Sequence, residues 1–342
     1  MPAAAAPPSA DWRALPKVLL HEHLDGGLRP QTLLELCRER GLSTPADDAA
    51  ALAAWVQANA NSGSLGRYLA GFKLTVAAMA SLPAVERVAF EAAEDALDDG
   101  CVLAEFRIAP LLLEAFGLRG EAVVEALLAG LRRSTLPCGL IVCAMRHEPP
   151  AHTHRAARLA ARYAGQGVIG FDLAGAEADH PPTPHARAFG AAREAGLGLS
   201  CHAGEADVGA RVLEAAALGV TRIGHGIHIV DDARNLERAR ELGLHFEVCP
   251  SSNVHTGAAA SLATHPIGAM LSAGLSLSVS TDNRLMSGVS LSGELQAMHE
   301  ALGLSLAQVR QMQREAAAAS FMPEAARSAA AAALAPTPAL GR

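Results

Sequence analysis

Eight short apolar runs, rich in β-branched residues, recur along the chain and predict eight β-strands. They cover residues 17–23, 101–109, 140–145, 168–173, 197–202, 222–225, 245–250 and 275–281. Between most of these runs lie segments with helical spacing, at residues 120–133, 155–165, 184–195, 208–218 and 232–242. Strands that alternate with helices eight times are typical of a parallel (β/α)₈ (TIM) barrel.

The competing fold is an open, doubly wound parallel sheet. Such a sheet usually has fewer strands and a glycine-rich phosphate-binding turn after the first one. Here the first apolar run ends in His21-x-His23 and continues into Asp25-Gly-Gly27, with no G-x-G-x-x-G pattern. The barrel is therefore the favoured interpretation.

The stretch between the first two predicted strands, residues 24–100, is longer than a single crossover helix requires. Helical patterns cover residues 30–40, 49–59, 64–80 and 84–98. We expect a helical insertion near the barrel mouth, which serves either as a lid or as extra packing. The predicted organisation is a flexible N-terminal segment (1–15), one barrel domain (16–325) and an Ala/Pro-rich tail (326–342) that frays.

Composition agrees with one large soluble barrel. Of the 342 residues, 50% are hydrophobic and 18% are charged, which allows a large core and excludes global disorder. The net charge of −7 argues against a nucleic-acid-binding surface. We expect no signal peptide and no membrane span, because no leader-like pattern and no run of about 18 apolar residues occurs.

The six cysteines form no C-x-x-C pair, and most lie in apolar runs. We interpret them as free buried thiols of a protein in a reducing compartment, the cytoplasm. No heptad pattern or large apolar stripe indicates an oligomeric state.

Polar residues stand where several of the predicted strands end. His21 and His23 close the first run, His202 the fifth and His225 the sixth, and Asp282 follows the last. In a TIM barrel these ends lie at one face, so the side chains could converge on one divalent ion such as zinc. This arrangement predicts hydrolysis by an activated water molecule.

Two small residues and Glu205 follow His202, and this carboxylate could face the same pocket. Several of these positions also have a simpler explanation. Two histidines at i and i+2 arise by chance, and Glu205 or Asp282 could cap the helix that follows. Asp172 is expected to be a buried hydrogen-bond acceptor. Cytidine-deaminase-type zinc sites need a C-x-x-C motif, which this chain lacks. A site with two metals bridged by a lysine needs one on a middle strand, but Lys17 and Lys73 are elsewhere, so one metal is favoured.

Eight motifs together resemble the adenosine deaminase family of the amidohydrolase superfamily, in family order from about residue 16 to residue 323. They lie at residues 17–26, 104–107, 170–175, 202–205, 224–226, 249–253, 265–268 and 280–283. The chain looks most similar to actinobacterial-type members of that family.

The resemblance implies one zinc ion per chain, held by three histidines and an aspartate: His21, His23, His202 and Asp282. It also implies two catalytic residues. Glu205 would protonate purine N1, and His225 would take the proton of the attacking water or hold the hydroxide. The activity implied is deamination of adenosine and 2′-deoxyadenosine to the inosine products and ammonia, a reaction of purine salvage.

The same resemblance implies the residues that bind the substrate. Asp25 would bond a ribose hydroxyl and the amide of Gly175 would meet purine N3. Much of the family has a second aspartate that bonds N7, whereas this chain has Asn283, whose NH₂ group donates directly. An apolar gate would be formed by Leu65, Tyr68, Leu69 and Phe72, although an ordinary amphipathic helix has the same spacing.

Two alternatives to adenosine deamination remain open. The substrate could be another 6-aminopurine, such as adenine, a modified adenine or an aminofutalosine-type nucleoside; Asp25 argues against free adenine. A catalytically inactive purine-binding barrel would be expected to lack one of the ligands or the acid. The expected partner in every case is a small purine, with neither nucleic acid nor membrane.

Overall fold

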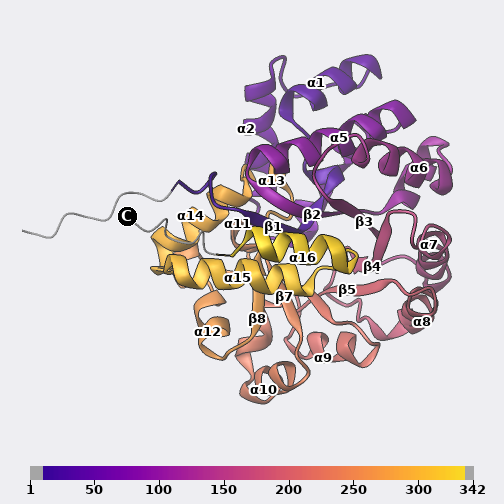
Figure 1. Cartoon of the computed structure of the whole chain (residues 1–342). Helices are drawn as coiled ribbons and strands as arrows, with labels where there is room; N and C mark the ends of the chain where they lie inside the picture. Colours follow the sequence, from indigo (N-terminus) through magenta and orange to yellow (C-terminus); the bar gives the residue numbers. More distant parts are fainter. Residues whose placement is uncertain (1–10, 336–342) are drawn as a thin grey trace, which may run out of the picture.

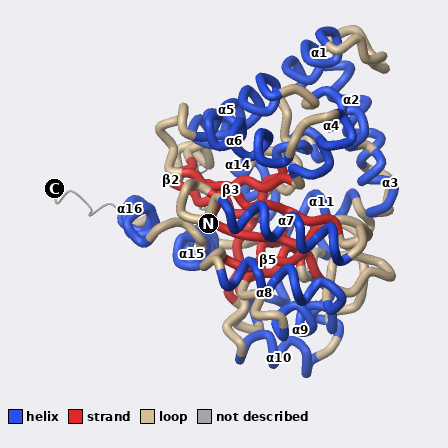
Figure 2. Tube along the Cα trace, turned by 90° about the vertical axis from the view of Figure 1, so that its right-hand side faces the viewer, coloured by secondary structure: helices blue, strands red, loops and turns tan. Residues whose placement is uncertain are grey.

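The computed structural model describes residues 11–335 and shows an eight-stranded parallel sheet in sequential order (Figure 1). In Figure 2 the strands gather at the centre of the molecule and helices surround them. The prediction of a (β/α)₈ barrel is therefore confirmed, with the strands β1 Lys17–His23, β2 Cys101–Ile108, β3 Cys138–Met145, β4 Val168–Ala174, β5 Gly198–Ala203, β6 Arg222–His225, β7 His245–Val248 and β8 Ser276–Val279.

The barrel closes between β1 and β8 through Asp282, which follows β8. The backbone N–H of Asp282 donates to the carbonyl of His21 at 2.9 Å, and the N–H of His23 donates to the carbonyl of Asp282 at 2.7 Å. A single bridge, Glu22 to Asp282, marks this pairing in the described residues. The first and last strands therefore meet at the carboxyl end of β1.

Helices follow the strands as the sequence predicted, with shifted boundaries. The five helices expected between strands are α6 Gly120–Leu131, α7 Pro150–Arg162, α8 Ala186–Glu194, α9 Ala210–Ala217 and α10 Ala233–Glu241. Helix α7 begins at Pro150 because proline suits the first position of a helix. The remaining C-terminal helices are α11 Pro250–His255, α12 Ile267–Ser272, α13 Arg284–Ser287, α14 Leu291–Leu302, α15 Leu306–Ala319 and α16 Glu324–Ala333.

The expected insertion between β1 and β2 is helical. It contains α1 Pro30–Glu39, α2 Ala49–Ala60, α3 Leu65–Ala70, α4 Phe72–Ala78 and α5 Leu82–Asp98. The single helix predicted over residues 64–80 is divided at Gly71 into α3 and α4. Figure 1 shows α1 and α2 at the top of the molecule, far from α10 at the bottom.

Both predicted terminal boundaries differ from the structure. Residues 1–10 and 336–342 lie outside the described residues, but Trp12 is buried and its carbonyl accepts a 2.8 Å hydrogen bond from Lys17 Nζ. Helix α16 occupies much of the predicted tail. Alanine favours helix, and Ala330 and Leu334 are buried in a cluster that includes Leu103 of β2.

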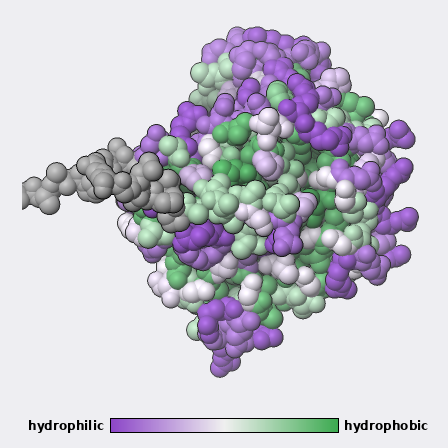
Figure 3. Space-filling view, viewed as in Figure 1, coloured by the Kyte–Doolittle hydropathy of each residue, from purple (hydrophilic) through white to green (hydrophobic). Residues whose placement is uncertain are grey.

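The face in Figure 3 is hydrophilic at its edges and more apolar toward its centre, where α15 and α16 cross the barrel.

All six cysteines are unpaired and five are buried. In the part of the chain described, no single helix is long and apolar enough to cross a membrane; only a pair bent by 118°, residues 65–78 with 82–98, has the length and composition.

The ring of Phe321 closes the amino-terminal end of the barrel. The guanidinium of Arg222 lies 3.9 Å from the ring centroid, and the Glu105 carboxylate accepts a 2.6 Å hydrogen bond from the backbone N–H of Phe321. A Cβ atom at Gly198 would lie 2.2 Å from Cγ of Phe321. Glycine is therefore required at this position of β5 by the close approach of the ring.

We expect Gly198→Ala to lower the free energy of unfolding by about 1–3 kcal/mol, because the added methyl group displaces the Phe321 ring. Urea denaturation measures this change. Gly190→Ala is the matched control: residue 190 lies inside α8 with no atom within 4 Å of the added Cβ, and helix propensity should raise stability by about 0.5–1 kcal/mol. Equal stability of Gly198→Ala and the unaltered protein would contradict this packing argument.

Candidate active site

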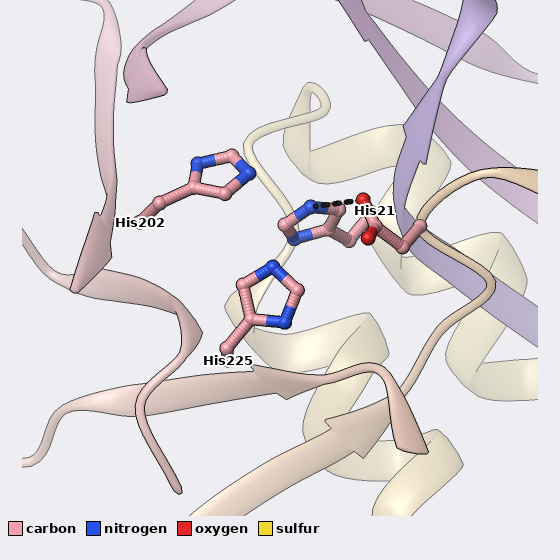
Figure 4. Close-up of side chains that lie close together, drawn as sticks. His21, His202 and His225 are labelled. Carbon is pink, nitrogen blue, oxygen red and sulfur yellow. Dashed lines mark ion pairs between the residues drawn. The ribbon is translucent and has the colours of Figure 1, made fainter. Parts of the chain in front are cut away.

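The residues predicted at the strand ends converge on one point. One ligand atom from each of His21, His202, His225 and Asp282 lies within 4.8 Å of the others. Figure 4 shows the imidazoles of His21, His202 and His225 turned toward one another. His23 joins this group, since its Nε2 lies 3.1 Å from Nε2 of His202 and 3.5 Å from Oδ1 of Asp282.

The distances within this cluster fit the binding of one metal ion. Ligand atoms about 2.0–2.1 Å from a common ion are separated by roughly 3–3.5 Å at tetrahedral or similar angles. The separations given for His23 fall in this range, and Nε2 of His21 lies 3.4 Å from Oδ1 of Asp282. Nε2 of His21 is also buried without a hydrogen-bond partner, which leaves its lone pair available to a cation.

Two buried carboxylates orient the imidazoles from behind. Glu247 Oε2 lies 2.9 Å from Nδ1 of His21, and Asp172 Oδ2 lies 2.9 Å from Nδ1 of His202. A carboxylate only accepts, so the ring of His21 places its proton on Nδ1 and its lone pair on Nε2, which is the usual state of a metal-ligating histidine. The negative charge of Asp172 favours the same state in His202. Asp172 also accepts a 3.5 Å hydrogen bond from Cys143 Sγ, which supports the expectation that it is a buried acceptor.

Glu247 was not among the residues singled out from the sequence. Burial raises the pKa of its carboxyl group, but Arg107 and Arg222 outweigh this effect and hold the pKa well below its usual range. Their hydrogen bonds to the two Glu247 oxygens are both 2.5 Å long. The only signal in the sequence was a charged residue in the middle of an apolar strand.

The backbone is unusual at two of the clustered residues. His225 has φ of 62° and Asp282 has φ of 57°, although neither is glycine. This left-handed conformation costs free energy and persists where surrounding contacts enforce it, often at functional sites. At Asp282 the contacts are the closure of the barrel and a 2.5 Å hydrogen bond from Ser252 Oγ to Oδ2.

Glu205 faces the same cluster from the loop after β5. Its backbone N–H and those of Gly204 and Ala206 all donate to the Glu177 carboxylate, at 2.9, 2.5 and 2.7 Å. Helix α9 begins only at Ala210, so the helix-capping explanation for Glu205 is wrong. Burial raises the pKa of Glu205, partly offset by nearby His225, and this favours the protonated form that a general acid needs.

Capping does not explain Asp282 either. The next helix, α13, begins at Arg284, its N-cap is Asn283, and no side chain caps it. Asn283 instead lines the cavity, with Oδ1 packed so closely on Gly26 that a Cβ there would lie 1.9 Å away.

A cavity of about 590 Å³ lies over the cluster and is lined by every residue predicted to bind substrate. These are Asp25, Gly175, Asn283, Leu65, Tyr68, Leu69 and Phe72. The apolar residues of α3 and α4 therefore face the cavity, as an insertion at the barrel mouth would place them. Oδ1 of Asp25 is buried without a hydrogen-bond partner, and burial raises the pKa of Asp25 to about 7.

Lining residues on β3 and just after it were missed from the sequence. His147, Met145 and Cys143 form the wall near Gly175, where φ is +94° and a Cβ would approach Nδ1 of His147 to 3.0 Å. Ala109 and Leu112 make this part of the cavity apolar. Their approach to the cavity depends on barrel closure, which local sequence patterns do not encode.

A TIM barrel that gathers imidazoles and a carboxylate at its strand ends, beside a buried glutamate, defines a hydrolase of the amidohydrolase type. A family model described as adenosine deaminase matches residues 16–335. An adenosine deaminase of Mycobacterium tuberculosis is 42% identical to this chain, over 93% of each protein. The chain therefore belongs to the adenosine deaminase family.

Solved structures agree with this assignment. An adenine deaminase from Arthrobacter aurescens is similar with a TM-score of 0.84 and 25% identity, over 94% of this chain and 98% of the other. An amidohydrolase from Burkholderia ambifaria, crystallised with bound Zn, has a TM-score of 0.86 and 24% identity, over 94% of this chain and 90% of the other. The second similarity shows the shared fold.

We expect Asp172→Asn to weaken divalent-metal binding about 10- to 100-fold, because an amide can donate to Nδ1 of His202 and shift the ring proton to Nε2. Competition with a chromophoric chelator measures the affinity. Asp231→Asn is the matched control, since Asp231 pairs at 2.8 Å with His228 on the surface. Unchanged affinity in Asp172→Asn would remove the role given to this carboxylate.

Proposed function

We propose that this protein is a zinc-dependent enzyme that hydrolyses adenosine and 2′-deoxyadenosine to inosine and 2′-deoxyinosine plus ammonia. The observation that carries the proposal is one cavity lined both by the buried acid Glu205 and by the clustered His23, His202, His225 and Asp282. Membership of the adenosine deaminase family supports the reaction.

One zinc ion per chain would be held by His21, His23, His202 and Asp282. When bound, the ion would polarise a water molecule and bring its pKa close to neutrality. A second ion bridged by lysine finds no support, because Lys17 Nζ donates to backbone carbonyls and Lys73 lies on α4 at the cavity.

Glu205 is the proposed proton donor to purine N1. Its Oε1 accepts a 3.0 Å hydrogen bond from Thr256 Oγ1, which leaves Oε2 for the substrate. As the water oxygen adds to C6, N1 gains the Glu205 proton, and one proton of the water passes to the resulting carboxylate, directly or by way of His225. The second water proton passes to N6, the bond from C6 to N6 breaks and ammonia leaves, with Glu205 protonated again. His225, with Nε2 at 3.5 Å from Glu205 Oε2, accepts a water proton or donates a hydrogen bond to that oxygen.

The polar lining supports a nucleoside over a free base. The unpartnered Oδ1 of Asp25 needs a donor, and a ribose hydroxyl supplies one. Gly175 would donate its amide to N3 and Asn283 its NH₂ group to N7, under an apolar gate of Leu65, Tyr68, Leu69 and Phe72. The adenine deaminase among similar structures keeps free adenine as the alternative substrate.

We also place the enzyme in the cytoplasm, in purine metabolism. The free thiols and the net charge of −7 support a reducing compartment and a small-molecule substrate, not nucleic acid.

The test is the ultraviolet absorbance change when zinc-quantified protein is mixed separately with adenosine, 2′-deoxyadenosine, adenine and bulkier 6-aminopurine nucleosides. We expect rapid loss of adenosine absorbance and about one zinc per chain, as a mononuclear site requires. Turnover of another compound alone would change the substrate but keep the chemistry. Binding without any turnover would show a purine-binding protein instead.

We expect Glu205→Gln to retain zinc and bind adenosine but to lower kcat about 10²- to 10⁴-fold, because the amide cannot give a proton to N1. Stopped-flow absorbance and equilibrium binding separate the two effects. Glu214→Gln on α9, a residue that pairs with Arg211 away from the cavity, is the control. A near-normal kcat in Glu205→Gln would exclude Glu205 as the donor.

A further inference from the structure

A directed chain of hydrogen bonds runs from the backbone of α12 to His225. It begins at the backbone N–H of Ile267, which lies 3.2 Å from Nδ1 of His265. A backbone N–H can only donate, so Nδ1 of His265 accepts and the ring proton is on Nε2. Burial lowers the pKa of His265 to about 4, so the ring is neutral near pH 7. Its Nε2–H faces Oδ1 of Asn253 at 3.2 Å.

This contact fixes which way the amide of Asn253 points. With Oδ1 accepting from His265, Nδ2 donates one hydrogen to Nδ1 of His225 at 2.9 Å. Its second hydrogen faces Oε1 of Glu205 at 3.5 Å. The reversed amide would set NH₂ against the Nε2–H of His265, and its carbonyl oxygen against Oε1 of Glu205, which already accepts from Thr256 Oγ1. Two neighbours therefore select the same orientation.

We propose that Asn253 and His265 are positioning residues that hold His225 in the tautomer with its proton on Nε2. His225 then acts as a hydrogen-bond donor to the oxygen that adds to C6, and as neither the base nor a metal ligand. This inference rests on the proposed function, in which His225 had two possible roles. Nδ1 accepts from Asn253, so a neutral ring has no lone pair on the cavity side.

The three clustered imidazoles are thus distinguished by the group behind each ring. Behind His21 stands the Glu247 carboxylate, which accepts from Nδ1 and leaves a lone pair on Nε2. Behind His202 stands the Asp172 carboxylate, whose negative charge 2.9 Å from Nδ1 favours the same arrangement. Behind His225 stands an amide NH₂, which donates to Nδ1 and leaves a proton on Nε2. Distances alone group all three as possible ligands. Whether the group behind each ring accepts or donates a hydrogen bond separates them: His21 and His202 are assigned as ligands and His225 as a hydrogen-bond donor.

The same amide also orients the acid. Asn253 and Thr256 both direct hydrogens at Oε1 of Glu205, so the proton of the neutral carboxyl group is on Oε2, toward the cavity. Asn253 lies in the motif at residues 249–253 and His265 opens the one at 265–268, and neither had a role from the sequence. The amide of Asn253 therefore determines which atom carries the proton in both His225 and Glu205.

Asn253→Asp tests the proposal with an isosteric change. An aspartate at position 253 only accepts, so it draws the proton of His225 to Nδ1 and leaves a lone pair on Nε2. Loss of the donor should lower kcat about 10²- to 10³-fold, with KM changed less than about threefold. A base needs that lone pair, so unchanged or higher kcat in Asn253→Asp would overturn the proposal. Asn235→Asp, at the start of α10, is the control.

Nitrogen-15 NMR of the histidine rings provides a second measurement that does not depend on turnover. In the unaltered protein the His225 signals should show a protonated Nε2 and an unprotonated Nδ1, and Asn253→Asp should reverse them. An unprotonated Nε2 in the unaltered protein would overturn the proposal. His225→Gln should retain at least tenfold more activity than His225→Ala, because its amide still donates; equal activities would contradict donation.

These measurements separate the inference from the proposed function. If the purine panel shows no turnover, the deaminase proposal fails, while the ring-nitrogen spectrum still decides the tautomer. If adenosine is deaminated but Nε2 is unprotonated, the deaminase proposal stands and the donor role of His225 fails.

Discussion

The ion pairs made by the buried carboxylate of Glu247 are the interactions on which the rest of the structure depends. This carboxylate lies inside the barrel without exposure and is bound by Arg107, Arg222 and the ring of His21. These partners come from β2, β6 and β1, so one charge from β7 joins four strands. A buried charge that loses one partner costs about 3–5 kcal/mol. The ion pairs that stabilise the barrel therefore also set the orientation of the His21 ring.

The arginines extend this network to the other functional residues. Arg107 lies 3.5 Å from Asp172, the carboxylate behind His202, and Arg222 pairs with Glu105 at 2.6 Å. Glu105 in turn binds Ser320 and Phe321 at the opposite end of the barrel. Paired charged groups therefore line much of the barrel interior. One set of ion pairs therefore connects the candidate active site at the carboxyl end of the barrel with Phe321 at the amino-terminal end.

The sequence predicted what local patterns encode. All eight strands were found because short, mostly apolar segments alternate with helical ones, and His21, His202 and Asp282 were found because each stands where such a segment ends. Partners on other strands were not found, because Glu247 or Asn253 acquires its role only when distant strands close into a barrel. Helix α16 was mistaken for a tail for a related reason. Its alanines look like low complexity until Ala330 is seen packed in a cluster with Leu103.

The closure of the barrel at Asp282 has a consequence for the motions of the protein. In the described residues, β1 and β8 are joined by one bridge, so this seam is the place where the sheet can open with the loss of few hydrogen bonds. The proposed metal ligands lie on both sides of it, with His21 and His23 on β1 and Asp282 after β8. A bound ion would link the first and last strands through its ligands. Its removal would then increase the rate of amide hydrogen exchange along β1 and β8. Metal content would then set how tightly the first and last strands of the barrel are held together.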